Sequence, residues 1–459
     1  MPQWLSDLLP ILILLGVVAL LIARLPRVDF GHSDTFKQRR LLNWLPLGLT
    51  YSFLYMGRYN LNVAKTALGD LMTKQDFSDI FFWGTLTYGV SFVINGPLTD
   101  KLGGRATIMI SAVGSALCNL AMGWTLHVGQ TENLVSTFSL LYAANMYFQS
   151  FGAVSIVKVN AHWFHVRERG VFGGIFGILI SLGIYFAYDW GRRIVENVST
   201  PAVFFVPTAV LIVFAVIDWF YVYDSPSQTG HKDFDTGDAS ADSKSRTSAL
   251  KVAAAMFKNP IIVTIALIEF CSGYLRQAIM QYYPFFAKET GSWDGFVAQN
   301  WGMLLCVAGI SGGVFAGIIS DHVFGSRRGP VAAVLYAGML VGAGVAGFLL
   351  ESVALGYLMV AMSLCIIGVH GMLSGTASMD FGGKHNAGVA VGIIDGFVYL
   401  GTAAVALVLG EVLPKDGTAA SKDASNWINW PLVMLPIALI GLVLALRLWN
   451  ARPVRTNVH

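Results

Sequence analysis

The feature that most constrains this chain is a series of long apolar stretches that recurs along almost its whole length. An α-helix needs about 20 largely apolar residues to cross the hydrocarbon core of a bilayer. Such stretches lie at residues 43–66, 79–99, 105–127, 134–163, 170–190, 201–222, 258–282, 297–320, 329–350, 354–375, 386–412 and 428–448. Because these runs are long and continuous, they predict membrane-spanning helices and not the short alternating strands of a membrane β-barrel.

The composition agrees with a surface that largely faces lipid. Of the 459 residues, 55% are hydrophobic and only 12% are charged. Soluble globular proteins carry about 25% charged residues, so this chain has too few polar side chains to cover a soluble surface of its size. The formal net charge of +3 gives no strong basic field, so we expect the bilayer and not nucleic acid as a partner.

The Lys and Arg residues indicate the orientation. If the run that ends at residue 99 exits to the cytoplasm, most of the 30 basic residues lie in cytoplasmic segments, as the positive-inside rule requires. A further apolar run at 8–23 has positive charges after it and none before it. These flanks do not fit a cleaved signal peptide. We expect an extra N-terminal helix that spans from outside to inside; an interfacial helix is the alternative.

Polar segments divide the chain into two halves. The linker at 224–256 is rich in Ser, Asp, Lys and Gly, which is typical of a flexible connection. The expected organisation is an extra N-terminal helix with a basic cytoplasmic linker (1–42), a six-helix bundle (43–223), the cytoplasmic linker (224–256), a second six-helix bundle (257–450) and a cytoplasmic tail (451–459). The polar stretch at 414–427 predicts an external loop.

A short motif follows the second helix of each half and indicates an internal repeat. The first copy comprises Gly96, Asp100, Gly103 and Arg105, and the second comprises Gly317, Asp321, Gly325 and Arg327. In each copy the Asp lies near a helix end, and the Arg can pair with an acidic group when the cytoplasmic face closes. We therefore expect Asp100, Arg105, Asp321 and Arg327 to form gating salt bridges.

The first helix of each half also carries a lone arginine. Arg58 precedes Asp100 by 42 residues, and Arg276 precedes Asp321 by 45 residues. The two arginines therefore occupy equivalent positions of a repeated fold, whose substrate site lies between the halves near the membrane midplane. A charge at the bilayer centre costs about 2.5–3.5 kcal/mol. A dianionic substrate offsets that cost, and guanidinium groups bind phosphate oxygens through two parallel hydrogen bonds.

A structural salt-bridge network is the alternative interpretation of the arginines. Glu269 lies seven residues before Arg276, on the same face of the helix. Asp395 could pair with either arginine or with Lys65. We therefore assign Glu269 and Asp395 to a salt-bridge and gating role, which is compatible with release of both carboxylates when an anion binds.

These motifs resemble the major facilitator superfamily, and several stretches resemble its organophosphate:phosphate antiporters, which exchange sugar phosphates or glycerol 3-phosphate. The matching pieces are Arg58, Tyr147-Phe148-Gln149, His162-Trp163-Phe164 with Glu168-Arg169-Gly170, Asp224-Ser225-Pro226, Leu275-Arg276, Gly388–Gly396 and Tyr399-Leu400-Gly401. The piece Ile393–Gly396 is especially similar to the eukaryotic branch. The resemblance covers about residues 43–450. It implies an all-α fold of two six-helix bundles with pseudo-twofold symmetry, to which the N-terminal helix is added, and a phosphate-binding role for the two arginines.

The resemblance also implies roles for other residues. Lys158 matches a family position that is often basic, although its side chain could instead extend to the membrane surface. Tyr88 and Tyr399 match tyrosines that line the cavity, with simple packing as the alternative. Asp380 matches an acidic position at the cytoplasmic end of the tenth helix, which favours gate pairing.

Two further residues are candidates from their own positions. Lys65 lies seven residues after Arg58 and faces the same side of the helix, so it can act in the site or in gating. His370, in the tenth helix, can donate a hydrogen bond to the substrate or make a structural polar contact.

Two positions depart from the bacterial glycerol-3-phosphate exchangers that the chain resembles. Phe92 stands where those exchangers carry a cavity lysine, and the segment 177–183 lacks their histidine. Both differences make the cavity less polar, which allows a larger or more apolar ester.

No enzyme site, cofactor site or metal site is expected. The glycine pairs at 103–104 and 173–174 lack the lysine and the preceding strand of a phosphate-binding loop. The cysteines are widely spaced in apolar segments, which fits buried thiols and neither a metal cluster nor a disulfide framework. They are Cys118, Cys271, Cys306 and Cys365.

The sequence therefore predicts a secondary active transporter that carries a phosphorylated organic anion, by alternating access, in exchange for inorganic phosphate. We expect a monomer in the inner membrane of a bacterium. One alternative is a proton- or sodium-coupled organic-anion symporter, a class that usually lacks an arginine equivalent to Arg276. Another is a membrane sensor that keeps the transporter fold.

Overall fold

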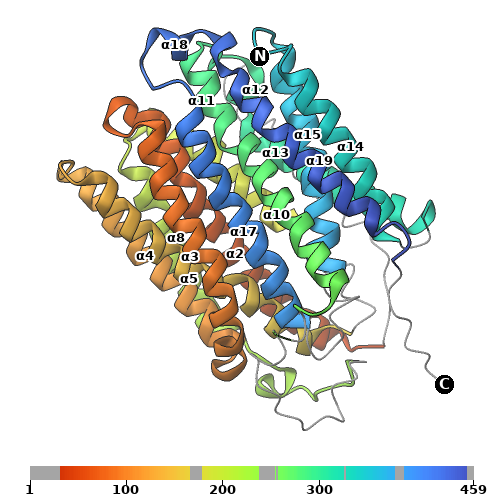
Figure 1. Ribbon diagram of the computed structural model, residues 1–459. Helices are drawn as coiled ribbons and strands as arrows, with labels where there is room; N and C mark the ends of the chain where they lie inside the picture. Colours follow the sequence, from red (N-terminus) through yellow and green to blue (C-terminus); the bar gives the residue numbers. More distant parts are fainter. Residues whose placement is uncertain are drawn as a thin grey trace, which may run out of the picture.

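The computed structural model describes residues 31–165, 178–236, 254, 257–324, 327–377 and 387–451. Within these residues the regular structure is helical, and long helices run side by side through the molecule (Figure 1). The expected all-α membrane fold is confirmed. The apolar run at 8–23 lies outside the described residues, so the extra N-terminal helix stays a prediction, as do the domain boundaries.

The first half of the chain begins with a helix that is longer than its apolar run. Its elements are α2 (Asp34–Leu68), η1 (Gly69–Leu71), α3 (Lys74–Leu102), α4 (Gly104–His127), α5 (Leu134–Trp163), the π-helical turn η2 (Phe186–Trp190), α7 (Gly191–Asn197), α8 (Ala202–Tyr221) and η3 (Pro226–Thr229). The Ser33 hydroxyl accepts a hydrogen bond from the Phe36 backbone nitrogen at 3.3 Å. This cap starts α2 within the basic segment, ahead of the predicted run at 43–66.

The second half contains both membrane-length helices and short external elements. It comprises α10 (Pro260–Met280), α11 (Tyr282–Glu289), α12 (Phe296–Gln299), α13 (Trp301–His322), α14 (Arg328–Ala346), α15 (Ala354–His370), the π-helical turn η5 (Gly371–Ala377), α17 (Ala387–Val412), α18 (Ala419–Lys422), η6 (Ala424–Ile428) and α19 (Asn429–Arg447). The predicted loop at 414–427 holds α18 and most of η6.

Nine helices of the described part are long and apolar enough to cross a membrane. The other three predicted spans do not meet these requirements of length and apolar composition within the described residues. The run at 43–66 is interrupted by buried polar residues of α2, among them Asn60 and Arg58. The run at 170–190 is described only from residue 178, and in α13 the side chains at 317 and 318, which follow Trp301–Ala316, lie outside the described residues.

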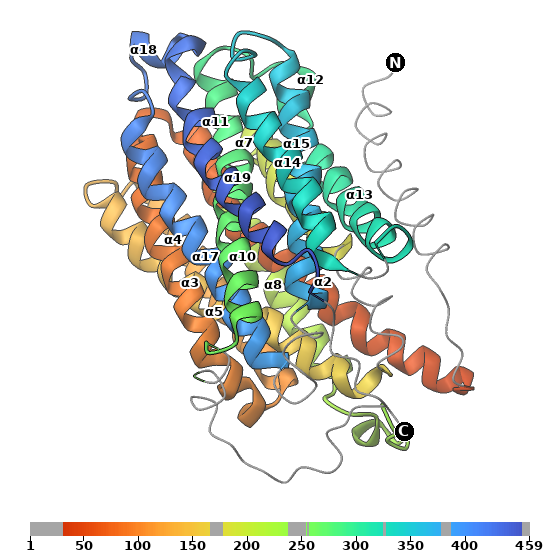
Figure 2. The same ribbon diagram turned by 45° about the vertical axis from the view of Figure 1, so that its right-hand side comes forward.

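Helix α17 joins the two halves. It packs against α3 of the first half and against α10 of the second, and both views show it beside these helices (Figures 1 and 2). Glycines permit the close approach to α10: a Cβ atom at Gly273 would collide with the Val398 carbonyl, and one at Gly401 with the Phe270 carbonyl. Small residues of this kind let membrane helices pack backbone to backbone. This packing brings Arg276 of α10 next to the residues of α17.

Candidate functional site

Arg58 lies fully buried on α2, with 1% of its surface exposed. Its Nε donates to Gln149 Oε1 at 2.9 Å, Nη1 to the Tyr399 hydroxyl at 2.7 Å and Nη2 to the Tyr88 hydroxyl at 2.8 Å. The guanidinium carbon also lies 4.4 Å from the ring centroid of Tyr55. Among the described residues no carboxylate pairs with Arg58, so neutral groups alone hold its charge.

A network of amides and hydroxyls fixes Gln149. Its side-chain nitrogen donates to the Ser115 hydroxyl at 3.1 Å and to Asn145 Oδ1 at 3.2 Å. The Tyr142 hydroxyl donates to the Arg58 carbonyl oxygen at 3.1 Å. Because these residues come from α4 and α5, contacts with those two helices fix the position of the Arg58 guanidinium in addition to α2 itself.

Arg276 lies on α10 and has 7% of its surface exposed. Its buried Nε has no hydrogen-bond partner in the described part of the chain. The predicted alternative, an ion pair with Glu269 on the same helix, is not what the structure contains, because Glu269 pairs with His370. Arg276 therefore retains hydrogen-bonding capacity that a substrate could use.

Two tyrosines bring the arginines into one site. Both guanidinium groups interact electrostatically with Tyr55 and Tyr399. Tyr399 comes from α17 of the second half, yet it accepts a hydrogen bond from Arg58 of the first half, and its ring centroid lies 4.2 Å from that of Tyr88. Tyr88 and Tyr399 thus stand beside Arg58, and their contact with substrate stays a prediction.

The acidic residues near Arg276 have partners of their own. Glu269 has no exposed surface, and its Oε2 lies 2.9 Å from His370 Nδ1. Asp395 accepts a hydrogen bond from the Ser374 hydroxyl. His370 therefore makes a polar contact with a carboxylate, which was one of its two expected roles, and its contact with substrate stays a prediction. The pairing of Asp395 with Lys65 is wrong, because the Lys65 side chain lies in a different cluster.

Lys65 belongs to an outer ion-pair cluster of Lys65, Lys74, Asp416 and Glu289. Asp416 Oδ2 lies 2.9 Å from Lys65 Nζ, and its other oxygen contacts Lys74 Nζ. The three side chains are at most 5% exposed. Glu289 accepts hydrogen bonds from the loop that carries Asp416, at the Gly417 nitrogen and the Ser421 hydroxyl. Lys65 of α2 therefore pairs with the loop after α17, in the other half of the chain, and its expected role in gating stays a prediction.

Charge pairing decides the ionisation of Asp416, which lies in the external loop. Burial by itself would raise the pKa of the Asp416 carboxyl. The neighbouring Lys65 and Lys74 outweigh burial and hold that pKa below its usual value of 3.8.

The predicted cytoplasmic gate is described only in part. Gly103 has a φ of 88°, which turns the chain between α3 and α4. Arg105 contacts the Trp219 carbonyl, and its backbone nitrogen donates to Asp224 at 2.9 Å. Arg327 donates to the Phe324 carbonyl at 3.0 Å. The side chains of Asp100 and Asp321, and all of Asp380, lie outside the described residues, so the gating salt bridges stay predictions.

Lys158 and Phe92 lie in different surroundings. Lys158 is half-buried on α5, and its backbone oxygen lies 3.1 Å from His162 Nδ1. Its predicted contact with substrate stays a prediction. Phe92 packs in the site itself, with its ring centroid 4.8 Å from that of Tyr88 and 6.0 Å from that of Tyr399. This apolar wall agrees with the expected loss of polarity in the cavity.

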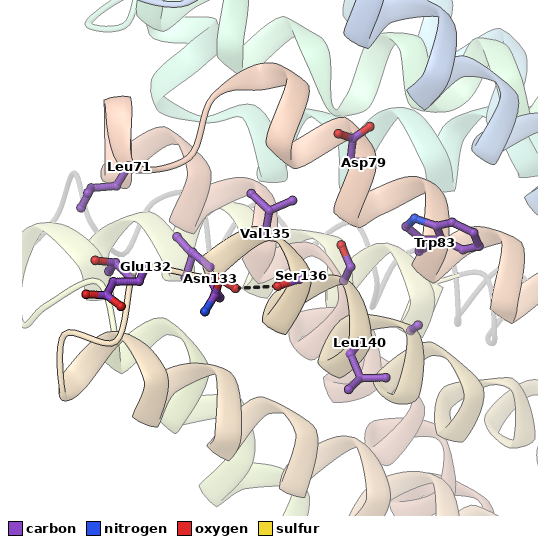
Figure 3. A pocket seen from close by; sticks show the side chains of 12 residues that line it. Leu71, Asp79, Trp83, Glu132, Asn133, Val135, Ser136 and Leu140 are labelled. Carbon is purple, nitrogen blue, oxygen red and sulfur yellow. Dashed lines mark hydrogen bonds between the residues drawn. The ribbon is translucent and has the colours of Figure 1, made fainter.

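A surface hollow of about 780 Å³ lies at the outer ends of α3 and α5 (Figure 3), and neither Arg58 nor Arg276 lines it. Its lining includes Asp79, Glu132 and Asn133, and no lysine or arginine. Carboxylates without a basic residue disfavour an anion, so this hollow is not a candidate for the phosphate site.

Sequence reasoning missed Gln149, Lys74 and Asp416. Gln149 lies within a stretch that resembles the antiporters, and that resemblance was a usable signal. Asp416 contacts residues more than 300 positions away, in a loop that reads as ordinary polar sequence. No local pattern could have identified it.

Comparisons with known proteins agree with this fold. The family model described as Major Facilitator Superfamily matches residues 47–406. The glycerol-3-phosphate transporter of Bacillus subtilis is 25% identical over 92% of this chain and 96% of that protein. The probable hexose phosphate transport protein of Chlamydia trachomatis is 23% identical over 92% and 94%. The membrane sensor protein UhpC of Escherichia coli is 23% identical over 90% and 92%.

A solved structure supports the fold in the same way. The crystal structure of a D-xylose-proton symporter is similar with a TM-score of 0.63 and 15% identity, and the match covers 88% of this chain and 97% of that one. One family model matches most of the chain, and the relatives match it over most of their length. Such matches indicate common descent. The chain is a multi-pass integral membrane protein that belongs to the Major Facilitator Superfamily.

Proposed function

We propose that this protein exchanges a phosphorylated organic anion for inorganic phosphate across the membrane, and that Arg58 and Arg276 bind the phosphate group. The observation that carries the proposal is a pair of buried arginines, one from each half, around the same tyrosines. Within the described residues neither arginine pairs with a carboxylate. An uncompensated buried charge is costly, and a dianion removes that cost for both.

The geometry gives a route from binding to transport. Arg58 is aimed by the N-terminal bundle, and Arg276 lies on the C-terminal bundle with an unpartnered Nε. A phosphate that binds both guanidinium groups draws the two halves together, which alternating access requires. The outer cluster of Lys65, Lys74, Asp416 and Glu289 must then separate for the outer face to open.

The relatives support the class of substrate. Two of them are named for transport of glycerol 3-phosphate and hexose phosphate, and we propose an ester of this class for this chain. The apolar Phe92 beside the tyrosines favours an ester whose organic part is larger than glycerol. We further propose that the protein acts as a monomer in the inner membrane of a bacterium.

The test is exchange in proteoliposomes loaded with inorganic phosphate. External glycerol 3-phosphate or hexose phosphates should accelerate phosphate release. Arg58→Lys and Arg276→Lys should abolish the exchange, because an ammonium group cannot reproduce the two parallel hydrogen bonds of guanidinium. Arg447→Lys is the matched control, since Arg447 is exposed at the end of α19. Exchange that survives both site substitutions would falsify the assignment.

The sensor alternative has a specific basis, because UhpC of Escherichia coli is named a membrane sensor. A pure sensor binds the phosphate ester without moving it. Binding without counterflow in the same proteoliposomes would therefore favour a sensor, whereas counterflow establishes a transporter.

A further inference from the structure

The outer ends of two helices are capped by carboxylates from the opposite half of the chain. Asp189 of the π-helical turn η2, in the first half, accepts hydrogen bonds from the backbone nitrogens of Gly302 and Met303, each at 2.8 Å. These nitrogens belong to the first turn of α13, in the second half. N–H groups in the first turn of a helix have no partner within the helix, so a carboxylate beside them is stabilising. Asp189 is therefore a helix cap that crosses the boundary between the halves.

Asp416 makes the corresponding contact in the opposite direction. It lies in the loop after α17, in the second half, and its Oδ2 accepts a hydrogen bond from the Lys74 backbone nitrogen at 2.5 Å. Lys74 is the first residue of α3, in the first half. The same carboxylate also pairs with the side chains of Lys65 and Lys74. Each half thus supplies one carboxylate to the N-terminus of a helix in the other half.

The internal repeat relates the two caps. Each capped helix is the second membrane helix of its half, α3 or α13, and each carboxylate lies at the outer end of a fifth helix, in η2 or after α17. Contacts that a pseudo-twofold axis along the membrane normal relates lie on opposite sides of that axis. We name these contacts the α13 seam, where η2 meets α13, and the α3 seam, where α17 meets α3. The caps therefore fasten both sides of the boundary between the halves at its outer end.

Glycines bring the backbones close together at both seams. A Cβ atom at Gly302 of α13 would lie 3.0 Å from Tyr188 Cβ. A Cβ atom at Gly410 of α17 would lie 2.8 Å from Ser78 Cβ. Both distances are shorter than ordinary contacts between carbon atoms, so a larger residue would push the seams apart. The close packing places each carboxylate within reach of the helix that it caps.

Neither cap can survive separation of the outer ends. A hydrogen bond is lost once its donor and acceptor are more than about 3.5 Å apart, whereas alternating access requires the halves to move apart at the outer face. The helices of each half pack against one another, so each half moves largely as one body. Each cap therefore stabilises the closed outer face and contributes nothing to the open one.

We propose that Asp189 and Asp416 form a two-point latch on the outer face, in which each carboxylate closes its own seam and release of one favours release of the other. The coupling follows from the movement of whole halves. A chain that lacks one cap reaches the open state more easily, and in that state the other cap is broken as well. This inference goes beyond the proposed function, because it does not depend on which anion the protein carries.

A native cysteine can report the opening of the α13 seam. Cys306 of α13 has no exposed surface, and it packs with Ile178 and Tyr185 of the fifth helix. A membrane-impermeant thiol reagent added to right-side-out membrane vesicles, without substrate, should label Cys306 only when the seam opens. The background carries Cys118→Ala, Cys271→Ala and Cys365→Ala. Adding Cys306→Ala to this background should abolish the labelling.

Substitution at the remote seam is the decisive test. Asp416→Asn keeps the shape of the side chain and changes nothing at the α13 seam, yet it should raise the labelling rate of Cys306 about fivefold, as expected for the loss of one cap. Asp189→Ala should raise the rate at least as much, because it removes the cap beside the reporter. Glu132→Ala, at an exposed carboxylate between α4 and α5, is the matched control and should leave the rate unchanged.

The reciprocal test reports the α3 seam. Ser78 of α3 is fully buried, so Ser78→Cys in a chain whose four native cysteines are alanine provides the reporter. Asp189→Ala should raise its labelling rate about fivefold. Thermal unfolding in detergent identifies the folded variants, and Asp189→Asn, which keeps one acceptor oxygen, replaces Asp189→Ala if the latter does not fold.

Two outcomes would overturn the latch. If Asp416→Asn leaves the labelling of Cys306 unchanged, or if the Asp189 variants leave the labelling of Ser78→Cys unchanged, each cap acts only on its own seam. The labelling needs no substrate. A chain that fails to exchange phosphate therefore contradicts the proposed function alone, and the labelling rates still decide whether the two caps are coupled.

Discussion

Arg58 and Arg276 occupy equivalent positions of the two halves, yet their surroundings differ. Arg58 donates three hydrogen bonds to an amide and two tyrosine hydroxyls. Arg276 has an unpartnered Nε and lies on the same helix as Glu269. One arginine is therefore held by neutral groups, whereas the other lies near a carboxyl group.

The difference indicates a division of labour. A neutral shell keeps the full charge of Arg58 available to an anion, and its fixed geometry reduces the cost of ordering the guanidinium on binding. Arg276, in contrast, interacts electrostatically with the carboxyl groups of Glu269 and Asp395. The repeat thus supplies two cations, and divergence of their neighbours places only one of them near carboxyl groups.

The largest expected effect is on the arginines themselves. Arg58→Lys and Arg276→Lys should each reduce phosphate exchange by about 100-fold or more. Only Arg58→Lys should also lower the free energy of unfolding, by about 2 kcal/mol, because it leaves buried partners without their hydrogen bonds. Thermal unfolding in detergent measures this difference. Equal destabilisation by both substitutions would contradict the contrast between the two environments.

A second prediction gives Arg58 an acidic neighbour, so that its surroundings resemble those of Arg276. Gln149→Glu places a carboxylate against Arg58 with almost no change in shape. The ion pair would compete with phosphate, so KM for exchange should rise about tenfold, which corresponds to about 1.4 kcal/mol. Initial rates in proteoliposomes measure KM, and Gln228→Glu, in the cytoplasmic segment after α8, serves as control. An unaltered KM would mean that neutrality around Arg58 has no function.

A third prediction separates the two tyrosines from simple packing. Tyr399→Phe and Tyr88→Phe each remove one hydroxyl that accepts from Arg58 and keep the ring. Each should change KM by about three- to tenfold, as expected for one hydrogen bond to a charged group. Tyr142→Phe removes a hydroxyl bonded to the Arg58 backbone and should change KM less. Larger effects at Tyr142 would favour a purely structural role for this cluster.

The smallest expected effect concerns the outer cluster of Lys65, Lys74, Asp416 and Glu289. The pKa of Asp416 is lowered in the folded protein, so its stabilisation is present above the usual value of 3.8 and is lost only as the pH falls below it. Accessibility of a cysteine introduced at Asp70, near this cluster, should therefore stay constant between about pH 5 and pH 8. A change across that range would place a pH-sensitive element in the outer cluster.

Much of the fold followed from local sequence. Long apolar runs located the helices, because a bilayer demands a minimum length of apolar residues from each span. The boundaries were less predictable. The Ser33 cap extended α2 into polar sequence, and the buried polar residues of that helix reflect its place in the interior of the protein.

The site was predictable where the repeat provided information. Equivalent positions identified Arg58 and Arg276, and resemblance to a family indicated Tyr88 and Tyr399. The partners of Glu269 and Lys65 were not predictable, because each could reach several oppositely charged groups. Only the packing of α10 against α15 and of the external loop against α2 decided between them.

The sequence by itself determined that this protein is a helical membrane protein with two related halves and a buried cation in each. Those properties follow from apolar length, the motif repeat and the high cost of charge in a bilayer. Only the tertiary structure decided which cation is surrounded by neutral donors and acceptors and which lies near carboxyl groups. Ion pairs between helices depend on distances of a few ångströms between residues far apart in the chain, and no local pattern encodes such distances.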